Sequence, residues 1–291
     1  MPELLENPRS ARVKAVAALG KKDVRAETGL FLLEGPQAVS EALQYRPGLL
    51  QELFVTPTAL ERHAQIGEAA DAVGLELVFV TEAVLDAMAD TVTPQGVVAV
   101  CEQFPTSVKD VFRAVEESAP GDGADADAAG REARPGLVVV LEQVRDPGNA
   151  GTIIRAADSA GADAVVMTGR SVNPYNPKVV RSTTGSLFHL PVAVGVELPN
   201  AISRAKAAGY TVLAADVSGD DLLTVRAEGM LDGPTVWVFG NEARGLTEDD
   251  LRLVDRAVKV PIYGLAESMN LATAASVCLY ESAFAQRTAS R

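Results

Sequence analysis

A continuous apolar run, Leu137–Leu141, constrains the fold of this chain more than any other stretch. A strand at the centre of a parallel sheet is covered on both faces, so it lacks the alternation of apolar and polar residues seen in half-exposed strands. The run is followed by a polar loop and by a helical pattern over 150–160. Further strands are predicted over 164–168, 211–215, 235–239 and 257–262, with helices over 201–208 and 271–285. The pattern predicts an α/β domain with a mostly parallel sheet, helices on both faces and a ligand site at the C-terminal ends of the strands.

The first hundred residues alternate in the same way on a smaller scale, which indicates an αβα sandwich. After an N-terminal helix, strands are predicted over 31–35, 53–56, 75–80 and 96–100, with helices over 36–45 and 60–73. A helical pattern over 108–117 then leads into 118–135, which is rich in Ala, Gly, Asp and Pro and has no hydrophobic periodicity. We therefore expect an N-terminal domain over 1–103, a helix and flexible acidic linker over 104–135, and a C-terminal domain over 136–291.

Composition narrows the setting in which the protein works. The hydrophobic content of 47% in 291 residues supports a sizeable core, but no apolar run approaches the roughly 18 to 20 residues that a membrane span requires. The N-terminus lacks the apolar segment of a secretory signal. Cys101 and Cys278 both lie in apolar runs, so neither a disulfide framework nor a metal cluster is expected. We expect a cytoplasmic protein with no metal and no membrane segment.

The formal net charge of −13 argues against a protein whose whole surface binds nucleic acid. Residues 1–25 depart from this balance, with six basic against three acidic side chains. Two interpretations stay open from charge alone, a solvated amphipathic helix or a basic face that contacts RNA. The side chains that would form such a face are Arg9, Arg12, Lys14, Lys21 and Lys22.

Three loops beside apolar strands of the C-terminal domain contain the residues best suited to chemistry. The first, over 142–161, includes Gly148 and Gly151 but lacks the G-x-G-x-x-G spacing of a dinucleotide site. The apolar stripe of the following helix turns Arg155 away from the core. Arg155 is therefore either an ordinary surface arginine or a phosphate clamp, one turn inside a helix that begins at a glycine-rich loop.

The second loop, over 238–246, also has two interpretations. Gly240 and Gly245 permit a ligand to approach the backbone closely, and Glu242 is a carboxylate placed between them. An ordinary glycine turn would have the same composition.

The third loop lies within 260–275, where a strand is expected to give way to a helix. Asn270 stands at the expected N-cap position, and Ser268 comes just before it. A helix N-terminus of this kind either holds a polar or anionic ligand on its free N–H groups or is simply capped.

Taken together, the three loops resemble the motifs of a known family. The chain has N-x(5)-R after the first strand, FGNEARGL after a later one and VPIYGLAESMNLATAAS before the last helix. This order resembles the SpoU/TrmH-type RNA ribose 2′-O-methyltransferases of the SPOUT superfamily over about 137–287. FLLEGPQAVSEAL near the N-terminus looks like the family's substrate-binding domain, which is similar to ribosomal protein L30e. STTGSLFHLPV at 182–192 resembles the family's sequence between motifs.

The resemblance implies a C-terminal trefoil knot that holds S-adenosylmethionine. The cofactor would contact the backbone and apolar side chains around Gly240, Val260, Ile262 and Met269. Met269 stands where many relatives have leucine, a change that conserves volume and should preserve the pocket.

The implied reaction is methyl transfer to a ribose 2′-hydroxyl of RNA, and of large-subunit (23S) ribosomal RNA rather than tRNA because of the L30e-like domain. The family's catalytic positions correspond to Asn149, Arg155, Glu242, Ser268 and Asn270. Arg155 is the family's proposed base, but a guanidinium is almost always protonated in proteins, so holding the adjacent phosphate fits its chemistry better. The asparagines would bind ribose and backbone, Ser268 would bind the 2′-oxygen or order its loop, and Glu242 would fix Arg155 or another loop donor.

The resemblance further implies a homodimer with its active site at the interface, and the exposed face of the last helix is a candidate contact. The N-terminal domain, with its basic residues, would select the RNA. Alternatives are a non-catalytic RNA-binding or ribosome-assembly factor, a tRNA 2′-O-methyltransferase, and a small-molecule enzyme on a dinucleotide-binding sheet. The intact catalytic positions argue against the first, and the missing G-x-G-x-x-G argues against the last.

Overall fold

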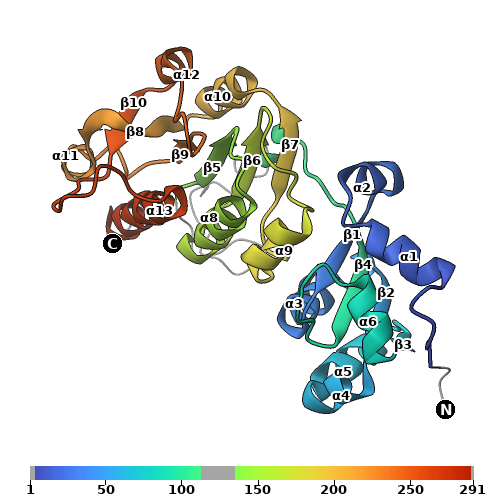
Figure 1. Ribbon diagram of the computed structural model, residues 1–291. Coiled ribbons are helices and arrows are strands. Elements are labelled where there is room, and N and C mark those ends of the chain that lie inside the picture. Colours follow the sequence, from blue (N-terminus) through green and yellow to red (C-terminus); the bar gives the residue numbers. More distant parts are fainter. Residues whose placement is uncertain (1–3, 113–134, 290–291) are drawn as a thin grey trace. The chain divides into compact units, whose positions relative to one another are not determined.

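The computed structural model describes residues 4–112 and 135–289, and Figure 1 shows their helices and strands. These residues form two compact units. Unit 1 extends to Phe104 and also includes Asn173–His189, whereas unit 2 comprises Pro105–Val172 and the chain from Leu190 onward. Residues 108–112 are helical, as predicted, but the rest of that predicted helix and all but one residue of the predicted acidic linker lie outside the described residues.

Unit 1 is built on a four-stranded sheet of order β1-β4-β2-β3, in which β2 and β3 are parallel and the other pairs antiparallel. Its elements from the first part of the chain are α1 (Ala11–Ala18), α2 (Lys22–Thr28), β1 (Leu30–Glu34), α3 (Pro36–Tyr45), the 3-10 turn η1 (Pro47–Leu49), β2 (Leu50–Val55), α4 (Pro57–Arg62), α5 (Ala64–Ala72), β3 (Leu77–Phe79), α6 (Glu82–Met88) and β4 (Val97–Glu102). From the later segment it takes α9 (Pro177–Thr183) and the 3-10 turn η2 (Ser186–Phe188).

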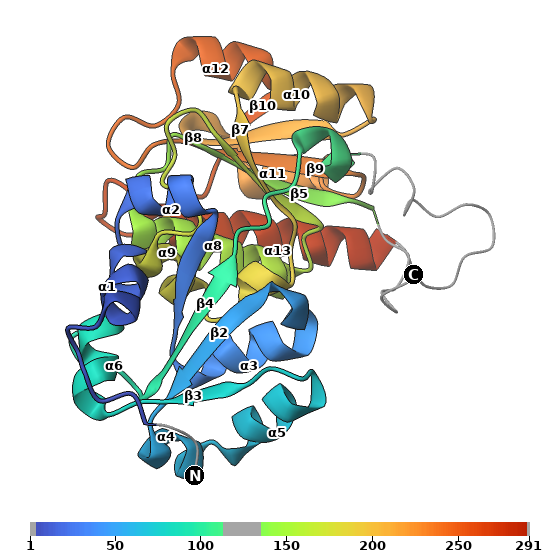
Figure 2. The same ribbon diagram turned by 90° about the vertical axis from the view of Figure 1, so that its right-hand side faces the viewer.

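Helices cover both faces of this sheet, as the αβα prediction requires. α1 and α6 bury their apolar residues against one face, in a cluster that includes Val16, Phe54 and Leu85. α3 packs on β1 and β4 and also contacts α5, as Figure 2 shows. Because each helix is amphipathic, the sheet becomes the middle layer of a closed core.

The segment 173–189 is held in unit 1 by an aromatic cluster. The ring of Tyr175 lies 4.9 Å from that of Phe31 and 5.7 Å from that of Phe104, and the rings of Phe104 and Phe188 stack at 5.8 Å. The Tyr175 hydroxyl accepts a hydrogen bond from the Phe104 N–H at 2.9 Å. Burial raises the pKa of Tyr175 to about 12, an effect that this hydrogen bond opposes. A stretch between two strands of unit 2 therefore belongs to the core of unit 1.

Unit 2 contains a six-stranded sheet of order β10-β8-β9-β5-β6-β7 with every neighbouring pair parallel. Its elements are β5 (Leu137–Glu142), α8 (Pro147–Ala160), β6 (Ala164–Thr168), β7 (Val192–Val196), α10 (Leu198–Ala207), β8 (Thr211–Asp221), α11 (Leu222–Ala227), β9 (Thr235–Phe239), α12 (Glu248–Leu253), β10 (Arg256–Lys259) and α13 (Leu271–Ala289). The predicted parallel α/β sheet is confirmed, and the trefoil knot stays a prediction.

Helices lie on both faces of this sheet, as Figure 2 shows, with α10 and α12 on one side and α8 and α13 on the other. Side chains of successive residues along each strand point to opposite faces of the sheet. Val236 and Val238 join the cluster under α10, whereas Trp237 donates a hydrogen bond to the Ser282 hydroxyl of α13 at 2.8 Å. Both faces of β9 are therefore covered, which explains its continuous apolar sequence.

Several boundaries differ from the sequence predictions, and two of these differences have a clear physical reason. The last strand ends at Lys259, not at 262, because β10 pairs only with β8 and Pro261 has no N–H with which to continue the ladder. The helix predicted over 60–73 is two helices that break at His63, since Thr56 caps an earlier start at Pro57. The short α2, α6, α9, β7, α11 and α12 were not predicted.

Within the described ranges, no helix combines the length and the apolar character that a membrane span needs. Those same residues hold no group of three or more His, Cys, Asp or Glu side chains suited to a metal ion.

The burial of both thiols gives a test of the two cores. Cys101 and Cys278 are buried, and burial raises the pKa of each thiol, that of Cys278 to about 12. We expect neither thiol to react with Ellman's reagent in the native protein near the ordinary thiol pKa of about 8.5, and both to react after unfolding. Because folding favours the protonated thiols, their contribution to stability is lost as the pH rises above that ordinary value.

An Ala26→Cys variant, which places a thiol at an exposed position of α2, should react at once and serves as the control. Rapid reaction of the unaltered native protein would contradict the packing described.

Candidate active site

The candidate site lies where the order of the strands in unit 2 reverses. The chain runs outward from β5 through β6 to β7 and returns to place β9 on the other side of β5. Leu141 pairs with Phe239, so the loops that follow β5 and β9 leave the same edge of the sheet side by side. A cavity of about 580 Å³ lies among the loops at this edge, within the range of about 300–1,000 Å³ typical of ligand pockets. This is the position expected for a ligand in an open parallel sheet.

Hydrogen bonds join the first and second loops. The Asn241 amide donates to the carbonyl of Gln143 at 2.8 Å, and the Arg244 guanidinium donates to the Gln143 side chain at 3.0 Å. Gln143 has φ of 53°, an uncommon conformation for a residue with a side chain. Such strain is characteristic of functional loops held by their surroundings.

Glu242 fixes the backbone of the first loop. Its carboxylate accepts hydrogen bonds from the N–H groups of Arg145 at 3.3 Å and Asp146 at 3.0 Å. Asp146 in turn caps α8, because its carboxylate accepts the N–H of Asn149 at 2.7 Å. Of the two partners considered from the sequence, Glu242 therefore contacts loop donors and not Arg155.

Asn270 joins the third loop to the first. Its side-chain amide donates to Asn149 Oδ1 at 3.0 Å, while its Oδ1 accepts the N–H groups of Ala272 at 2.9 Å and Thr273 at 3.2 Å. The predicted N-cap is confirmed. One asparagine thus begins α13 and links two of the three loops.

Gly240 is required where the second loop folds back on itself. A Cβ at this position would lie 2.6 Å from the carbonyl carbon of Gly245 and 2.8 Å from its oxygen. The N–H of Gly245 closes the turn by donating to the Asn241 carbonyl at 2.8 Å. The two glycines therefore serve a close backbone approach, which a larger residue would prevent.

An irregularity in β8 supplies a wall that the sequence did not predict. Ala257 of β10 pairs with Ala214, but the next residue, Val258, pairs with Asp220. Residues 215–219 of β8 therefore have no partner on β10, and three of them, Ala215, Asp216 and Val217, line the cavity. Gly219 is the residue in the sequence that could have indicated this irregularity. A Cβ added at this position would lie 2.3 Å from the backbone of Ala257, so only glycine fits there.

Most of the predicted site residues line this one cavity. They are Asn149, Gly240, Glu242, Val260, Ile262, Ser268, Met269 and Asn270. The cavity also contains Asn241 and Arg244, which sequence reasoning missed although both lie between the two glycines of the second loop.

Arg155 does not line the cavity. It is exposed on α8, and in the part of the chain that the structure describes its guanidinium has no hydrogen-bond partner. The exposed face of α8 carries, at helical spacing, Thr152, Arg155 and Ser159. The Tyr280 hydroxyl of α13 donates a hydrogen bond to the Ser159 carbonyl of this face at 3.4 Å. Arg155 is therefore available to a second molecule.

The five predicted RNA-binding residues are all exposed on unit 1 (Arg9, Arg12, Lys14, Lys21 and Lys22). Arg12 is partly occupied, since it pairs with Glu52 and lies 5.0 Å from the ring centroid of Phe54. Arg25 has a different role. It is buried, and one guanidinium nitrogen donates to the carbonyls of Leu19 and Gly20. Burial lowers the pKa of Arg25, an effect that the nearby Asp90 opposes.

Comparison with known proteins connects these features. Residues 136–280 match the SpoU rRNA methylase family, and residues 10–99 match the MRM3-like substrate binding domain. The chain is 32% identical to a 23S rRNA (guanosine(2553)-2′-O)-methyltransferase of Bacillus subtilis, over 95% of this chain and 97% of the relative. It is 31% identical to a 23S rRNA (uridine(2479)-2′-O)-methyltransferase of Streptomyces viridochromogenes, over 94% of this chain and 89% of the relative.

The fold agrees with the sequence comparison. An AdoMet-bound rRNA methyltransferase from Sinorhizobium meliloti superposes with a TM-score of 0.78 at 30% identity, over 96% of this chain and 97% of that one. The resemblance seen in the three loops is thereby confirmed along nearly the whole chain, and the protein belongs to the SpoU rRNA methylase family.

Proposed function

We propose that this protein transfers a methyl group from S-adenosylmethionine to a ribose 2′-hydroxyl of 23S ribosomal RNA. The main support is that three loops distant in sequence line one cavity. This cavity lies at the edge of the parallel sheet where the order of the strands reverses. Two relatives that share nearly the full length of the chain are named as 23S rRNA 2′-O-methyltransferases. This similarity favours rRNA over tRNA as the substrate and the cytoplasm as the place of action.

The residues around the cavity fit S-adenosylmethionine. Val260, Ile262 and Met269 provide apolar surface for the adenosyl group, and Gly240 lines the same cavity. Asp216 and Glu242 offer carboxylates, which suit a ligand that carries an amino group and a positive sulfur. When bound, the cofactor supplies a methyl group activated by its sulfonium.

The reacting hydroxyl is a poor nucleophile and must lose its proton as it attacks, so the site has to position it and stabilise negative charge. We assign Asn149 and Asn270 to hold the ribose and the loop backbone, because their side chains already meet beside the cavity. Ser268 is the hydroxyl available to the 2′-oxygen. Glu242 positions the first loop, and Arg155 holds the neighbouring phosphate and stabilises charge on the oxygen.

We also propose that two copies pair and that Arg155 acts in the partner's cavity. Tyr280 and Phe284 on α13 are 38% and 50% exposed, and their rings lie 5.6 Å apart. Tyr280 contacts the same face of α8 that presents Arg155. A symmetric pairing across this face would cover the aromatic pair and bring each Arg155 to the other molecule.

Changing Gly240 to alanine should weaken S-adenosylmethionine binding by about tenfold or more, because the added Cβ would collide with the Gly245 carbonyl and deform the cavity wall. Isothermal titration calorimetry measures the effect. Gly233→Ala is the matched control, since a Cβ there would meet nothing within 4 Å. Equal affinity of Gly240→Ala and Gly233→Ala for the cofactor would exclude this cavity as its site.

Changing Arg155 to alanine should lower the rate of methyl transfer to rRNA by about a hundredfold, the usual effect of removing one charge stabiliser. The cofactor's dissociation constant should not change, because Arg155 is assigned to the RNA phosphate and not to the cofactor. Tritiated methyl incorporation and calorimetry measure the two quantities. Arg170→Ala removes another exposed arginine of unit 2 and should be silent. Full activity of Arg155→Ala would remove the role given to this residue.

Changing Phe284 to glutamate should raise the dimer dissociation constant about thirtyfold or more, as expected for a buried interface aromatic. Sedimentation velocity over a concentration series measures this. Leu223→Glu alters a side chain that is also 50% exposed, on α11, and should leave association unchanged. If the unaltered protein sediments as a monomer at all concentrations, the pairing is wrong.

A further inference from the structure

Selecting one ribose in rRNA requires contacts beyond the reacting hydroxyl. Two relatives of similar identity to this chain are named for a guanosine and for a uridine, so transfer to the ribose does not itself impose one base. Unit 1, whose first part matches a substrate binding domain, contains a second cavity, of about 240 Å³. It lies at the start of α3, between Gly35 and the loop that leads into β4. This volume is below the range of about 300–1,000 Å³ for drug-sized ligands, which suits one base better than a whole nucleotide.

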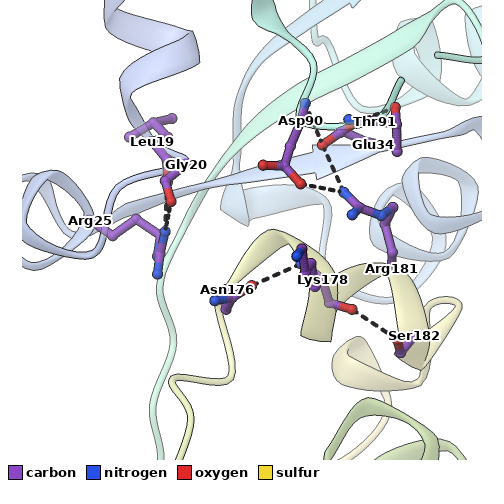
Figure 3. A network of polar contacts seen from close by, with 10 residues as sticks. All are labelled: Leu19, Gly20, Arg25, Glu34, Asp90, Thr91, Asn176, Lys178, Arg181 and Ser182. Carbon is purple, nitrogen blue, oxygen red and sulfur yellow. Dashed lines mark hydrogen bonds and ion pairs between the residues drawn. The ribbon is translucent and has the colours of Figure 1, made fainter. Parts of the chain in front are cut away.

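The charged groups around this cavity are occupied with one another. The buried Glu34 carboxylate accepts the N–H of Asp90 at 3.1 Å, and the N–H and hydroxyl of Thr91 at 3.2 and 2.7 Å. Arg181 of α9 reaches the same group, donating to Asp90 at 3.0 Å and to Glu34 at 3.4 Å, as Figure 3 shows. One cation therefore faces two carboxylates, a balance that disfavours a phosphate in the cavity.

Two neutral polar side chains of the cavity are unoccupied by comparison. Among the residues that the structure describes, the side chains of Thr93 and Gln95 have no hydrogen-bond partner, and both are exposed at the cavity wall. Gln95 lies over Gly35, where its Oε1 would be 3.3 Å from an added Cβ. Pro94 and Ala38 add apolar surface. A carboxamide and a hydroxyl beside an apolar wall match the edge and the face of a base.

We propose that this cavity binds one unpaired nucleobase of the RNA substrate, which Thr93 and Gln95 recognise at its edge. The inference rests on the proposed function for the nature of the ligand. Specific RNA recognition commonly uses bases that are unstacked and bound on their hydrogen-bonding edges. Arg181 is a positioning residue here, because it holds Asp90 and Glu34 and thereby the loop that carries Thr93 and Gln95.

The test is a double variant, Thr93→Val with Gln95→Ala, which removes both polar groups and leaves the Glu34 network intact. The matched control is Thr58→Val with Gln65→Ala, which alters the same residue types at exposed positions of α4 and α5. The RNA is a 23S rRNA fragment that the unaltered protein methylates. Fluorescence anisotropy without cofactor measures its affinity over a series of salt concentrations.

We expect the test variant to lose about tenfold or more in RNA affinity, with an unchanged slope of log affinity against log salt. Abasic substitutions scanned along the fragment should reveal one position, distinct from the methylated nucleotide, that weakens binding of the unaltered protein but not of the variant. The RNA affinity of Arg181→Lys should lie between that of the unaltered protein and that of the double variant. Lysine keeps the positive charge but cannot contact Glu34 and Asp90 in the way the guanidinium does.

Unchanged affinity of the test variant would overturn the proposal. The proposal would also be overturned if the slope of log affinity against log salt were smaller by about one in the test variant, because this would identify a phosphate contact. These outcomes differ from failure of the proposed function, which would appear as absence of methyl transfer from the unaltered protein to any rRNA fragment. In that case, binding to the fragments still tests the cavity.

Discussion

The parallel pairing of β5 with β9 is the contact on which the candidate active site depends. Because Leu141 lies opposite Phe239, the loops after these strands start at one edge, and Asn241 reaches Gln143 although 98 positions separate them. Glu242 then fixes the backbone of the first loop, and Asn270 adds the third. A shift of this register would separate all three loops at once, so the packing of the sheet and the geometry of the site are not independent.

Unit 1 depends in a similar way on a segment from later in the chain. Tyr175 and Phe188 complete its aromatic cluster, and Arg181 reaches the Glu34 network. A carboxylate as buried as that of Glu34 is stable only when its oxygens are satisfied, and the Asp90–Thr91 backbone and Arg181 satisfy them. Removing residues 1–104 would therefore expose part of the remaining chain, which makes point variants a cleaner test of RNA recognition than deletion.

The two cavities suit different ligands because their polar groups are used differently. Around the cavity of unit 2, charged and amide side chains fix the loop backbone, and the apolar walls remain for the ligand. Around the cavity of unit 1, charges neutralise one another and leave a hydroxyl and a carboxamide. Because the protein has a net charge of −13, we predict that its attraction for RNA phosphates is confined to local basic surface such as that of α1 and the start of α2.

Local sequence determined much of this protein. Apolar runs predicted the strands β5, β6 and β9, because strands covered on both faces carry no alternation, and Asn270 was found as an N-cap from its position before a helical pattern. The three loops, taken in order, also indicated the family. Only tertiary structure decided that 173–189 belongs to unit 1, that β8 loses its pairing with β10 where residues 215–217 line the cavity, and that Arg155 lies outside this cavity. The reason is physical: hydrophobic period and capping act over a few residues, whereas these features depend on contacts between distant segments, which no local pattern records.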